Sequence, residues 1–515
     1  MKKNILVRRT VFCAFIVGTM AGCQTLKADV PVQSRKSNVQ TVESNVIQTK
    51  KSVDLNEMKV DSTLEEMPTR QIISAQIEEL KKKLDLKSKD NFTRLTYARK
   101  LFQLGNFTES KNVVASMLKE KEPMDEAIYL SAQIEYVMGN YKESEKLFNK
   151  LNESNSEEYQ TKAQTGLLHT YYQTNQFHKA KNLTADLEKN LDEPLREMMK
   201  DFGKIKPYET NWGSNLKVVV PFIANELLPA VSIMVNGKQI NAIIDTGGDT
   251  FILDETMASY LGIKNISRIK GTYAGGVSVE TGYGRLDSLE MNGVTLKYVP
   301  VMIAPIKQFS AVYNDEIEIN GIITTGILKQ FLATMDYPRS QLILRPRNKQ
   351  GKTILKQYLA QHNMIDEIPF SLAASHFMMT KGSINGKESL NFFMDSGLAS
   401  EKTSMILLEQ TMTFAGIPKP KAEKKPGDIG GLGGNDFEVG EFTVDVFKLG
   451  KLPSEKNIWA EYGTLESSFN YDEGIGFFID GLVSHNFLKK YSWTIDFDSM
   501  KMIFSNYSIL TFYSP

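Results

Sequence analysis

The chain has 515 residues, of which 41% are hydrophobic and 24% charged, so it is too long for one hydrophobic core and apolar enough to fold as several domains. Lysine and arginine together number 61, as do aspartate and glutamate, and this balance creates no field of one sign that would attract a polyanion. Nucleic acid is therefore not an expected partner.

The first 22 residues are typical of an export signal. Basic residues at positions 2, 3, 8 and 9 precede an apolar run over 11–20, which is shorter than the roughly 20 residues that cross a bilayer. Residues 20–23, Met-Ala-Gly-Cys, resemble the lipobox of bacterial lipoproteins, in which the cysteine is acylated after cleavage. We therefore expect a signal peptide over 1–22 and a lipid on Cys23 that anchors the exported chain to the periplasmic side of the cell envelope. An ordinary secretory signal is the alternative.

Residues 23–70 are predicted to be the lipidated cysteine followed by a flexible tether. The segment is rich in Ser, Thr, Gln, Asn and Lys and has no aromatic residue. The only two cysteines are Cys13, inside the signal, and Cys23, so the mature chain cannot form an internal disulfide.

Residues 71–205 have a helical pattern that repeats. Gly-Asn-Phe at 105–107, Gly-Asn-Tyr at 139–141 and Asn-Gln-Phe at 175–177 recur at intervals of 34 residues (107 to 141) and 36 residues (141 to 177). Small residues keep the same register, nine positions before or three after the aromatic: Ala98, Ala132, Ser110, Ser144 and Ala180. The region resembles tetratricopeptide repeats, which are stacked helical hairpins that often bind a protein partner. A generic array of helical hairpins, acting as a spacer, is the alternative.

The pattern changes to β from about residue 214. Short apolar or alternating runs are separated by Asn-Gly turns at 236, 292 and 385, and such turns are typical of hairpins. The runs are 218–223, 230–235, 240–244 and 342–344.

Two tripeptides in this β region carry candidate chemistry, Asp245-Thr246-Gly247 and Asp395-Ser396-Gly397. Each follows an Asn-Gly turn and an apolar strand. Each is also followed by matched closing segments, such as Gly321-Ile322-Ile323 and Gly481-Leu482-Val483. The pattern indicates a duplicated lobe, over 214–348 and 349–515.

The two units resemble the lobes of retropepsin-like aspartic proteases, fused in one chain as in the pepsin-like enzymes, over about 300 of the 515 residues. The resemblance implies that Asp245 and Asp395 are catalytic, that the hydroxyls of Thr246 and Ser396 bond across the lobes, and that the substrate is a peptide or protein. Gly247 and Gly397 would let backbone amides approach the carboxyls.

A pair of carboxyls suits amide hydrolysis for a physical reason. Two carboxyls held close together cannot both ionise readily, so they share one proton. The ionised member can take a proton from water while the protonated member donates to the substrate carbonyl.

Each lobe also contains a candidate flap that would close over the substrate. In the first lobe it lies over 271–283, and in the second over 427–434, where five residues are glycine. The candidate substrate contacts are Tyr273, Gly275, Gly276, Gly430 and Gly431.

Two departures from the family pattern keep other functions open. Gly248 and Leu398 follow the tripeptides where a small side chain is usual, and Thr324 and Ser484 replace a glycine in the closing segments. Leu398 is expected to crowd the site, which favours a protease-like protein that binds peptides without cleaving them. A third possibility makes the repeats the functional centre of an envelope assembly protein.

No cofactor is expected. The five histidines are scattered, and no metal-binding spacing or dinucleotide loop is present in the sequence. The sequence therefore predicts a multidomain protein with an N-terminal all-α helical-repeat array followed by a mainly β, two-lobed aspartic-protease fold. Its predicted activity is that of a membrane-anchored aspartic-type endopeptidase.

Overall fold

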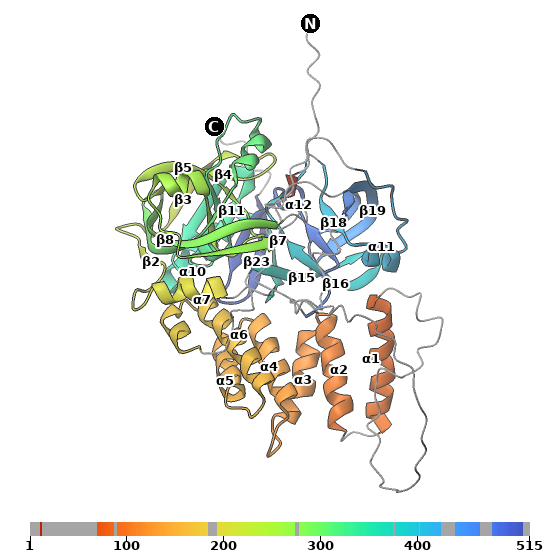
Figure 1. Cartoon of the computed structure of the whole chain (residues 1–515). Coiled ribbons are helices and arrows are strands. Elements are labelled where there is room, and N and C mark those ends of the chain that lie inside the picture. Colours follow the sequence, from red (N-terminus) through yellow and green to blue (C-terminus); the bar gives the residue numbers. More distant parts are fainter. Residues whose placement is uncertain are drawn as a thin grey trace, which may run out of the picture.

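The computed structural model describes residues 11–12, 69–86, 90–183, 193–272, 278–373, 376–400, 402–423, 438–463 and 476–507. In Figure 1 a row of helices lies along one side of two β lobes. Within these ranges no helix is both long and apolar enough to cross a membrane. Cys23 lies outside them, so the predicted lipid anchor stays a prediction.

The helical array confirms the predicted all-α region, and its helices pack in sequence order. Its first helix starts two residues before the predicted boundary at 71. The tetratricopeptide assignment itself stays a prediction. The elements are α1 Thr69–Leu86, α2 Asn91–Gln103, α3 Phe107–Met117, α4 Asp125–Val137, α5 Tyr141–Leu151, α6 Glu157–Gln173, the 3-10 helix η2 Phe177–Asn182 and α7 Glu193–Asp201.

The repeated tripeptides lie where one helix of a hairpin turns into the next. Gly105 and Gly139 have φ angles of 72° and 77°, in the left-handed region that glycine enters most easily. The small residues also lie at the helix contacts, since the buried Ser144 hydroxyl donates to the Ala132 carbonyl at 3.0 Å. The spacing therefore predicted both the turns and the close helix contacts.

The two lobes repeat one strand arrangement. The first lobe contains β2 Glu209–Asn211, β3 Val218–Ala224, β4 Ala230–Val235, β5 Lys238–Ile244, β6 Phe251–Asp254, β7 Ser267–Thr272, β8 Ser278–Met291, β9 Val294–Ala304 and β10 Gly321–Ile323, with α8 Glu255–Tyr260, η3 Lys307–Tyr313 and α9 Thr325–Leu328. The second contains β14 Ser371–Ala373, β15 Phe377–Ile384, β16 Lys387–Met394, β17 Leu398–Ala399, β18 Met405–Leu407, β19 Val439–Leu449, β20 Glu455–Gly463 and β21 Gly481–Val483, with α11 Glu409–Ala415 and α12 His485–Leu488.

The duplication extends to the strand order and the register. The order β4-β5-β10-β6-β9 in the first lobe corresponds to β15-β16-β21-β18-β20 in the second. In both lobes the strand that leads to the motif aspartate pairs in parallel with the closing strand, β5 with β10 and β16 with β21. Each motif aspartate is thus set at the same point of its lobe.

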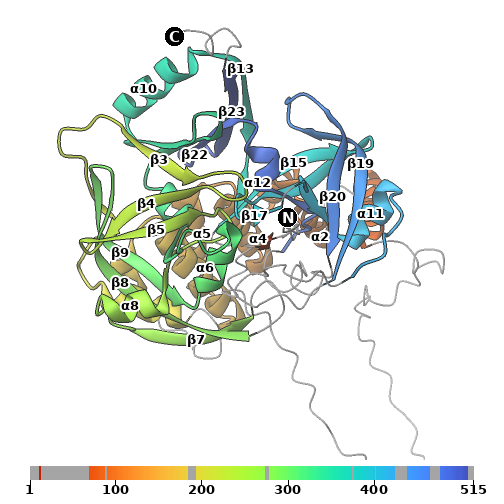
Figure 2. The same cartoon turned by 90° about the horizontal axis from the view of Figure 1, so that it is seen from above.

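A shared sheet joins the lobes at their base, with the strand order β13-β23-β22-β11-β12-β3. Figure 2 shows β13, β22, β23 and β3 of this sheet on the side of the molecule away from β7. Its strands not yet introduced are β11 Leu332–Asp336, β12 Gln341–Arg345, β13 His362–Pro369, β22 Ser492–Asp496 and β23 Lys501–Tyr507, flanked by η4 Tyr337–Arg339 and α10 Lys349–Leu359.

The two lobes meet in this sheet at a buried polar contact. Thr334 of β11 lies opposite Thr494 of β22, and their hydroxyls are 2.6 Å apart. The Arg345 guanidinium donates to the Thr334 hydroxyl at 2.7 Å. All three residues are buried, so loss of one partner leaves the others without a hydrogen bond away from water.

We predict that Thr334→Val lowers the free energy of unfolding by about 1–3 kcal/mol, because it orphans buried donors of Arg345 and Thr494. Thr443→Val, at an exposed strand position of β19, is the matched control and should stay within about 0.5 kcal/mol of the parent chain. Chemical denaturation measures both. Equal stabilities of the two variants would contradict a structural role for this contact.

Candidate active site

The structure brings Asp245 and Asp395 together. Each follows the last residue of its strand, and its backbone N–H donates to the closing strand, at 2.8 Å to the Ile323 carbonyl and at 2.9 Å to the Val483 carbonyl. Both side chains are fully buried, and oxygens of both carboxyls lie within 3.3 Å of the point where a Cβ on Gly247 would be. The predicted catalytic pair is thus formed by residues 150 positions apart in the chain.

The hydroxyls after the aspartates lock the two loops in a reciprocal way. The Ser396 N–H donates to the Thr246 hydroxyl and the Thr246 N–H donates to the Ser396 hydroxyl, both at 3.0 Å. The Thr246 hydroxyl donates in turn to the Met394 carbonyl at 2.8 Å, and the Ser396 hydroxyl to the Ile244 carbonyl at 3.1 Å. Each loop is therefore held by the opposite lobe, as the family resemblance implied.

The two motif glycines leave room for the carboxyls. A Cβ on Gly397 would lie 2.1–2.3 Å from the carboxyl atoms of Asp245, and one on Gly247 would lie 2.9 Å from Asp245 Oδ1 and 3.0 Å from Asp395 Oδ1. The N–H groups of both glycines donate to the carboxyl of their own motif, at 2.6 Å for Gly247 and 2.9 Å for Gly397. Glycine is thus required sterically at both positions.

The environment favours one shared proton on the pair. Burial raises the pKa of Asp245, and the neighbouring Asp395 charge raises it further. Burial also raises the pKa of Asp395, against the lowering effect of the Gly397 N–H. The Oδ2 atoms of both carboxyls are buried and receive no hydrogen bond from the described residues.

Leu398 does not crowd the carboxyls, so that expectation was wrong. Its side chain is 1% exposed and belongs to an apolar cluster with Phe102 and Val114 of the helical array and Phe393 of the second lobe. The array supplies an apolar environment for this side chain, which a protease lobe without such helices would lack.

The other departures, Thr324 and Ser484, are both buried, and the Thr324 hydroxyl has no hydrogen-bond partner among the described residues. Thr325, next to Thr324, donates its hydroxyl to the Gly248 carbonyl at 2.6 Å, and the Ser484 hydroxyl donates to the Thr403 carbonyl at 2.7 Å. Both contacts fix the loop that carries or follows a motif aspartate.

The predicted flap of the first lobe starts as a hairpin. β7 and β8 pair in antiparallel fashion up to Thr272 opposite Ser278, and the candidate residues Tyr273, Gly275 and Gly276 lie outside the described residues. In the second lobe Glu423 bridges Val439 in antiparallel fashion, and Gly430 and Gly431 also lie outside the described residues.

One strand edge beside Asp395 accepts an additional strand. Val11–Phe12, labelled β1, pairs in antiparallel fashion with Leu398–Ala399 of β17. The strand edge that follows Asp395 therefore pairs with an extended apolar segment through its backbone.

The sequence missed a buried polar cluster next to the first catalytic loop. The Tyr172 hydroxyl of α6 donates to the Asp249 carbonyl at 3.3 Å and lies 2.7 Å from the Thr250 hydroxyl. All three residues are buried. Asp249, four positions after Asp245, is visible in the sequence as a neighbouring acid, but no spacing rule links it to a tyrosine 77 residues earlier.

The described residues contain no group of His, Cys, Asp and Glu side chains that could hold a metal ion.

One comparison with known protein families covers the first lobe. Residues 231–327, from β4 to α9 and including Asp245, match a family model described as aspartyl protease. This match supports an aspartyl-protease domain. No curated protein matches the chain. Among solved structures, the chain is similar to a retropepsin-like aspartic protease from Rickettsia conorii, at 15% identity and a TM-score of 0.19 over 27% of this chain and 94% of that one.

We predict that the buried pair makes the protein less stable as the pH rises. The folded pair keeps a proton that the unfolded chain releases above pH about 4, so the free energy of unfolding falls between pH about 4 and the raised pKa. Asp245→Asn removes the contribution of Asp245 to this dependence and leaves that of the buried Asp395. Its stability relative to the parent should rise over pH 4–6 with a slope of up to about 1.4 kcal/mol per pH unit.

Denaturation at a series of pH values measures this slope. Asp287→Asn, at an exposed position of β8, is the control and should follow the parent at every pH. A parallel course of the parent and the Asp245→Asn variant would show that the two carboxyls do not share a proton.

Proposed function

We propose that the chain is an aspartic-type endopeptidase that hydrolyses peptide bonds with a water held between Asp245 and Asp395. The observation that carries this proposal is the buried, mutually locked pair of carboxyls, placed identically by two duplicated lobes. The aspartyl-protease match over the first lobe supports it.

In the proposed mechanism the ionised carboxyl accepts a proton from the water as its oxygen attacks the substrate carbonyl carbon. The protonated carboxyl donates to the carbonyl oxygen, which gives a neutral tetrahedral intermediate. Proton transfer to the amide nitrogen then allows the C–N bond to break, and the pair again holds one proton. The pair titrates as a unit, so acid and base roles belong to the pair.

The substrate is proposed to bind as an extended strand. The pairing of Val11–Phe12 with β17 supports this mode, because it places an apolar backbone segment beside the catalytic loop. The β7–β8 hairpin is proposed to cover the substrate from the other side, with Tyr273, Gly275 and Gly276 at its tip.

We also propose that the enzyme works in the cell envelope, anchored through a lipid on Cys23 and held off the bilayer by residues 24–70. The lipobox-like residues 20–23 and the composition of the tether support this. A protein partner at the helical repeats is part of the same proposal.

We expect the full chain, purified in detergent, to cleave members of a diverse peptide library with a bell-shaped pH dependence of kcat/KM. The midpoint of the acidic limb should lie above the pKa of an ordinary carboxyl, because the pKa of the pair is raised. Asp245→Asn and Asp395→Asn should each lose at least about 100-fold in kcat/KM.

Mass spectrometry of the cleaved peptides gives the rates, and Asp287→Asn is the control that should retain them. Equal cleavage by the parent and both active-site variants would refute the protease. Peptide binding without any cleavage by the parent would favour the inactive binding protein instead.

The anchor makes a separate prediction. Cys23→Ser should shift the chain from the membrane fraction to the soluble fraction, and intact-mass analysis should show the loss of an acyl-bearing N-terminus. An unmodified Cys23 in the membrane fraction would contradict the lipid anchor.

A further inference from the structure

The helical array reaches both lobes beside their catalytic loops. Its later helices share an apolar cluster with the first lobe, and its earlier helices share another with the second. Figure 1 shows the same row of helices passing beneath both lobes. The array therefore connects the lobes by a second route, separate from the base sheet.

On the first lobe, the contact is to the backbone of the catalytic loop. Tyr172 holds the Asp249 carbonyl and the Thr250 hydroxyl, only four and five residues after Asp245. Burial raises the pKa of Tyr172 well above its usual value, so its hydroxyl stays protonated and can donate.

The helix that follows β10 is held from the same side. The Lys329 ammonium donates to Gln173 Oε1 at 3.2 Å, and Asn175 donates to Gln330 Oε1 at 2.9 Å. This segment also contains Thr325, which binds the Gly248 carbonyl. The loop after Asp245 is thus held in two ways, directly by Tyr172 of α6 and indirectly through the Thr325 segment. Gln173 of α6 and Asn175 of the following turn contact that segment.

The array also supports the base of the β7–β8 hairpin. α7 packs against both strands, and the Ser267 hydroxyl of β7 donates to the Pro194 carbonyl at 3.0 Å. Figure 1 shows α7 beside this hairpin.

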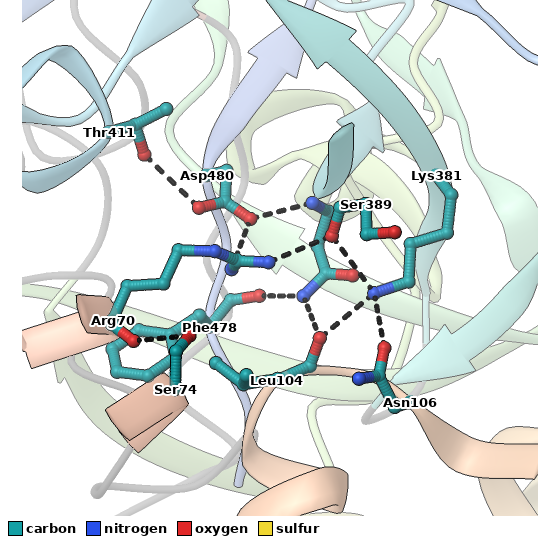
Figure 3. Close-up of polar contacts among 10 residues, drawn as sticks. Arg70, Ser74, Leu104, Asn106, Lys381, Ser389, Thr411, Phe478 and Asp480 are labelled. Atoms are coloured by element: carbon teal, nitrogen blue, oxygen red, sulfur yellow. Dashed lines mark hydrogen bonds and ion pairs between the residues drawn. The ribbon is translucent and has the colours of Figure 1, made fainter. Parts of the chain in front are cut away.

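On the second lobe, the contact is a buried ion pair. The Arg70 guanidinium lies 2.7 Å from Asp480 Oδ2 and donates to the Ser389 carbonyl at 2.8 Å, and the exposed fractions of the Arg70 and Asp480 side chains are 5% and 1% (Figure 3). Asp480 immediately precedes β21, the strand whose Val483 carbonyl holds the Asp395 N–H.

In the first lobe the corresponding position has no contact with Arg70. The duplicate of Asp480 is Asn320, and both residues donate their N–H to the carbonyl of an asparagine, Asn241 in the first lobe and Asn391 in the second. Asn320 bonds to Glu318 of its own lobe. The carboxylate, Asp480, thus occurs in the lobe that Arg70 contacts, and the other lobe has the neutral Asn320 at this position.

The neighbouring loop of the array completes the attachment. The Leu104 carbonyl accepts from Asn391 at 3.2 Å and from the Lys381 ammonium at 2.9 Å, and Lys381 also reaches Ser389 and Asn106 (Figure 3). Asn391 is in β16, four residues before Asp395. The array is therefore bonded to the strand that carries the second aspartate.

We propose that the helical array is an intramolecular clamp that holds the two catalytic loops in their mutual geometry, with Tyr172 as a positioning residue for the first loop and Arg70–Asp480 as the fastening to the second lobe. The proposal rests on the proposed peptidase function. In this proposal the helical repeats bind the two β lobes of the same chain.

Tyr172→Phe tests the first contact, because it removes only the hydroxyl. In the full chain in detergent we expect kcat to fall at least about tenfold with KM changed less than twofold, since a small displacement of a catalytic loop slows chemistry more than binding. Tyr171→Phe is the matched control, because Tyr171 is the adjacent residue of α6 and its ring faces Lys179 of the array. Equal kcat values for the two variants would overturn the positioning role.

A readout without activity separates this proposal from the function. The measurement compares the unfolding free energy of chains with Asp or Asn at position 245 over a series of pH values. The pH dependence of this difference should fall by at least half in the Tyr172→Phe background. In the Tyr171→Phe background it should stay unchanged. If the parent cleaves no peptide, the proposed function fails while this measurement still decides on the clamp. An unchanged difference in the Tyr172→Phe background would reject the clamp.

Arg70→Met tests the second contact, because it leaves Asp480 without its counter-charge. We expect kcat per folded molecule to fall at least about fivefold, with the folded fraction determined by circular dichroism. Asp480→Asn in the Arg70→Met background reproduces the neutral side chain of the first lobe and should restore at least half of the lost folded fraction. An Arg70→Met variant that folds fully and retains the parent kcat would rule out the fastening.

Discussion

The reciprocal hydrogen bonds between Thr246 and Ser396 are the constraint on which the rest of the site depends. Each loop donates its amide to a hydroxyl of the opposite loop, so neither loop can move alone without leaving buried groups unpaired. This constraint holds two buried carboxyls together, and their repulsion and burial raise their affinity for a proton. The base sheet, with its Thr334–Thr494 contact, carries the same alignment away from the site.

The helical array is a second element that holds the two lobes in a fixed relative position. A two-lobed fold with one shared sheet could hinge at that sheet. Besides the sheet, the lobes meet at the two aspartate loops and where His485 and Lys489 contact the carbonyls of Asn225 and Glu226. The array bonds to both lobes. Tyr172 contacts Thr250, five residues after Asp245, and Arg70 contacts Asp480, which precedes the strand that pairs with β16. Rigidity at the carboxyls is therefore supplied from three directions.

The sequence predicted the duplicated parts well and the long-range contacts poorly. Asp245 and Asp395, their hydroxyl neighbours, the Asn-Gly turns and the turns of the repeats follow from local chemistry that repeats in the chain, such as the left-handed φ of Gly105 and Gly139. Leu398 was misjudged because its surroundings come from helices about 300 residues earlier, which the spacing around the motif does not describe. For the same reason Tyr172 and Arg70 were not identified, since their partners are set by the packing of the array against the lobes.

The difference between Asn320 and Asp480 has a consequence for how such a chain can change. The two lobes are similar in topology, and a chain built from two copies of the first lobe would keep both motif aspartates in place. It would, however, present an amide where Arg70 needs a carboxylate, and a buried guanidinium would lose its counter-charge. The helical array can therefore dock in only one orientation on the two pseudo-symmetric lobes, with Arg70 at the lobe that contains Asp480. Once the array had docked in this way, the two lobes were no longer interchangeable.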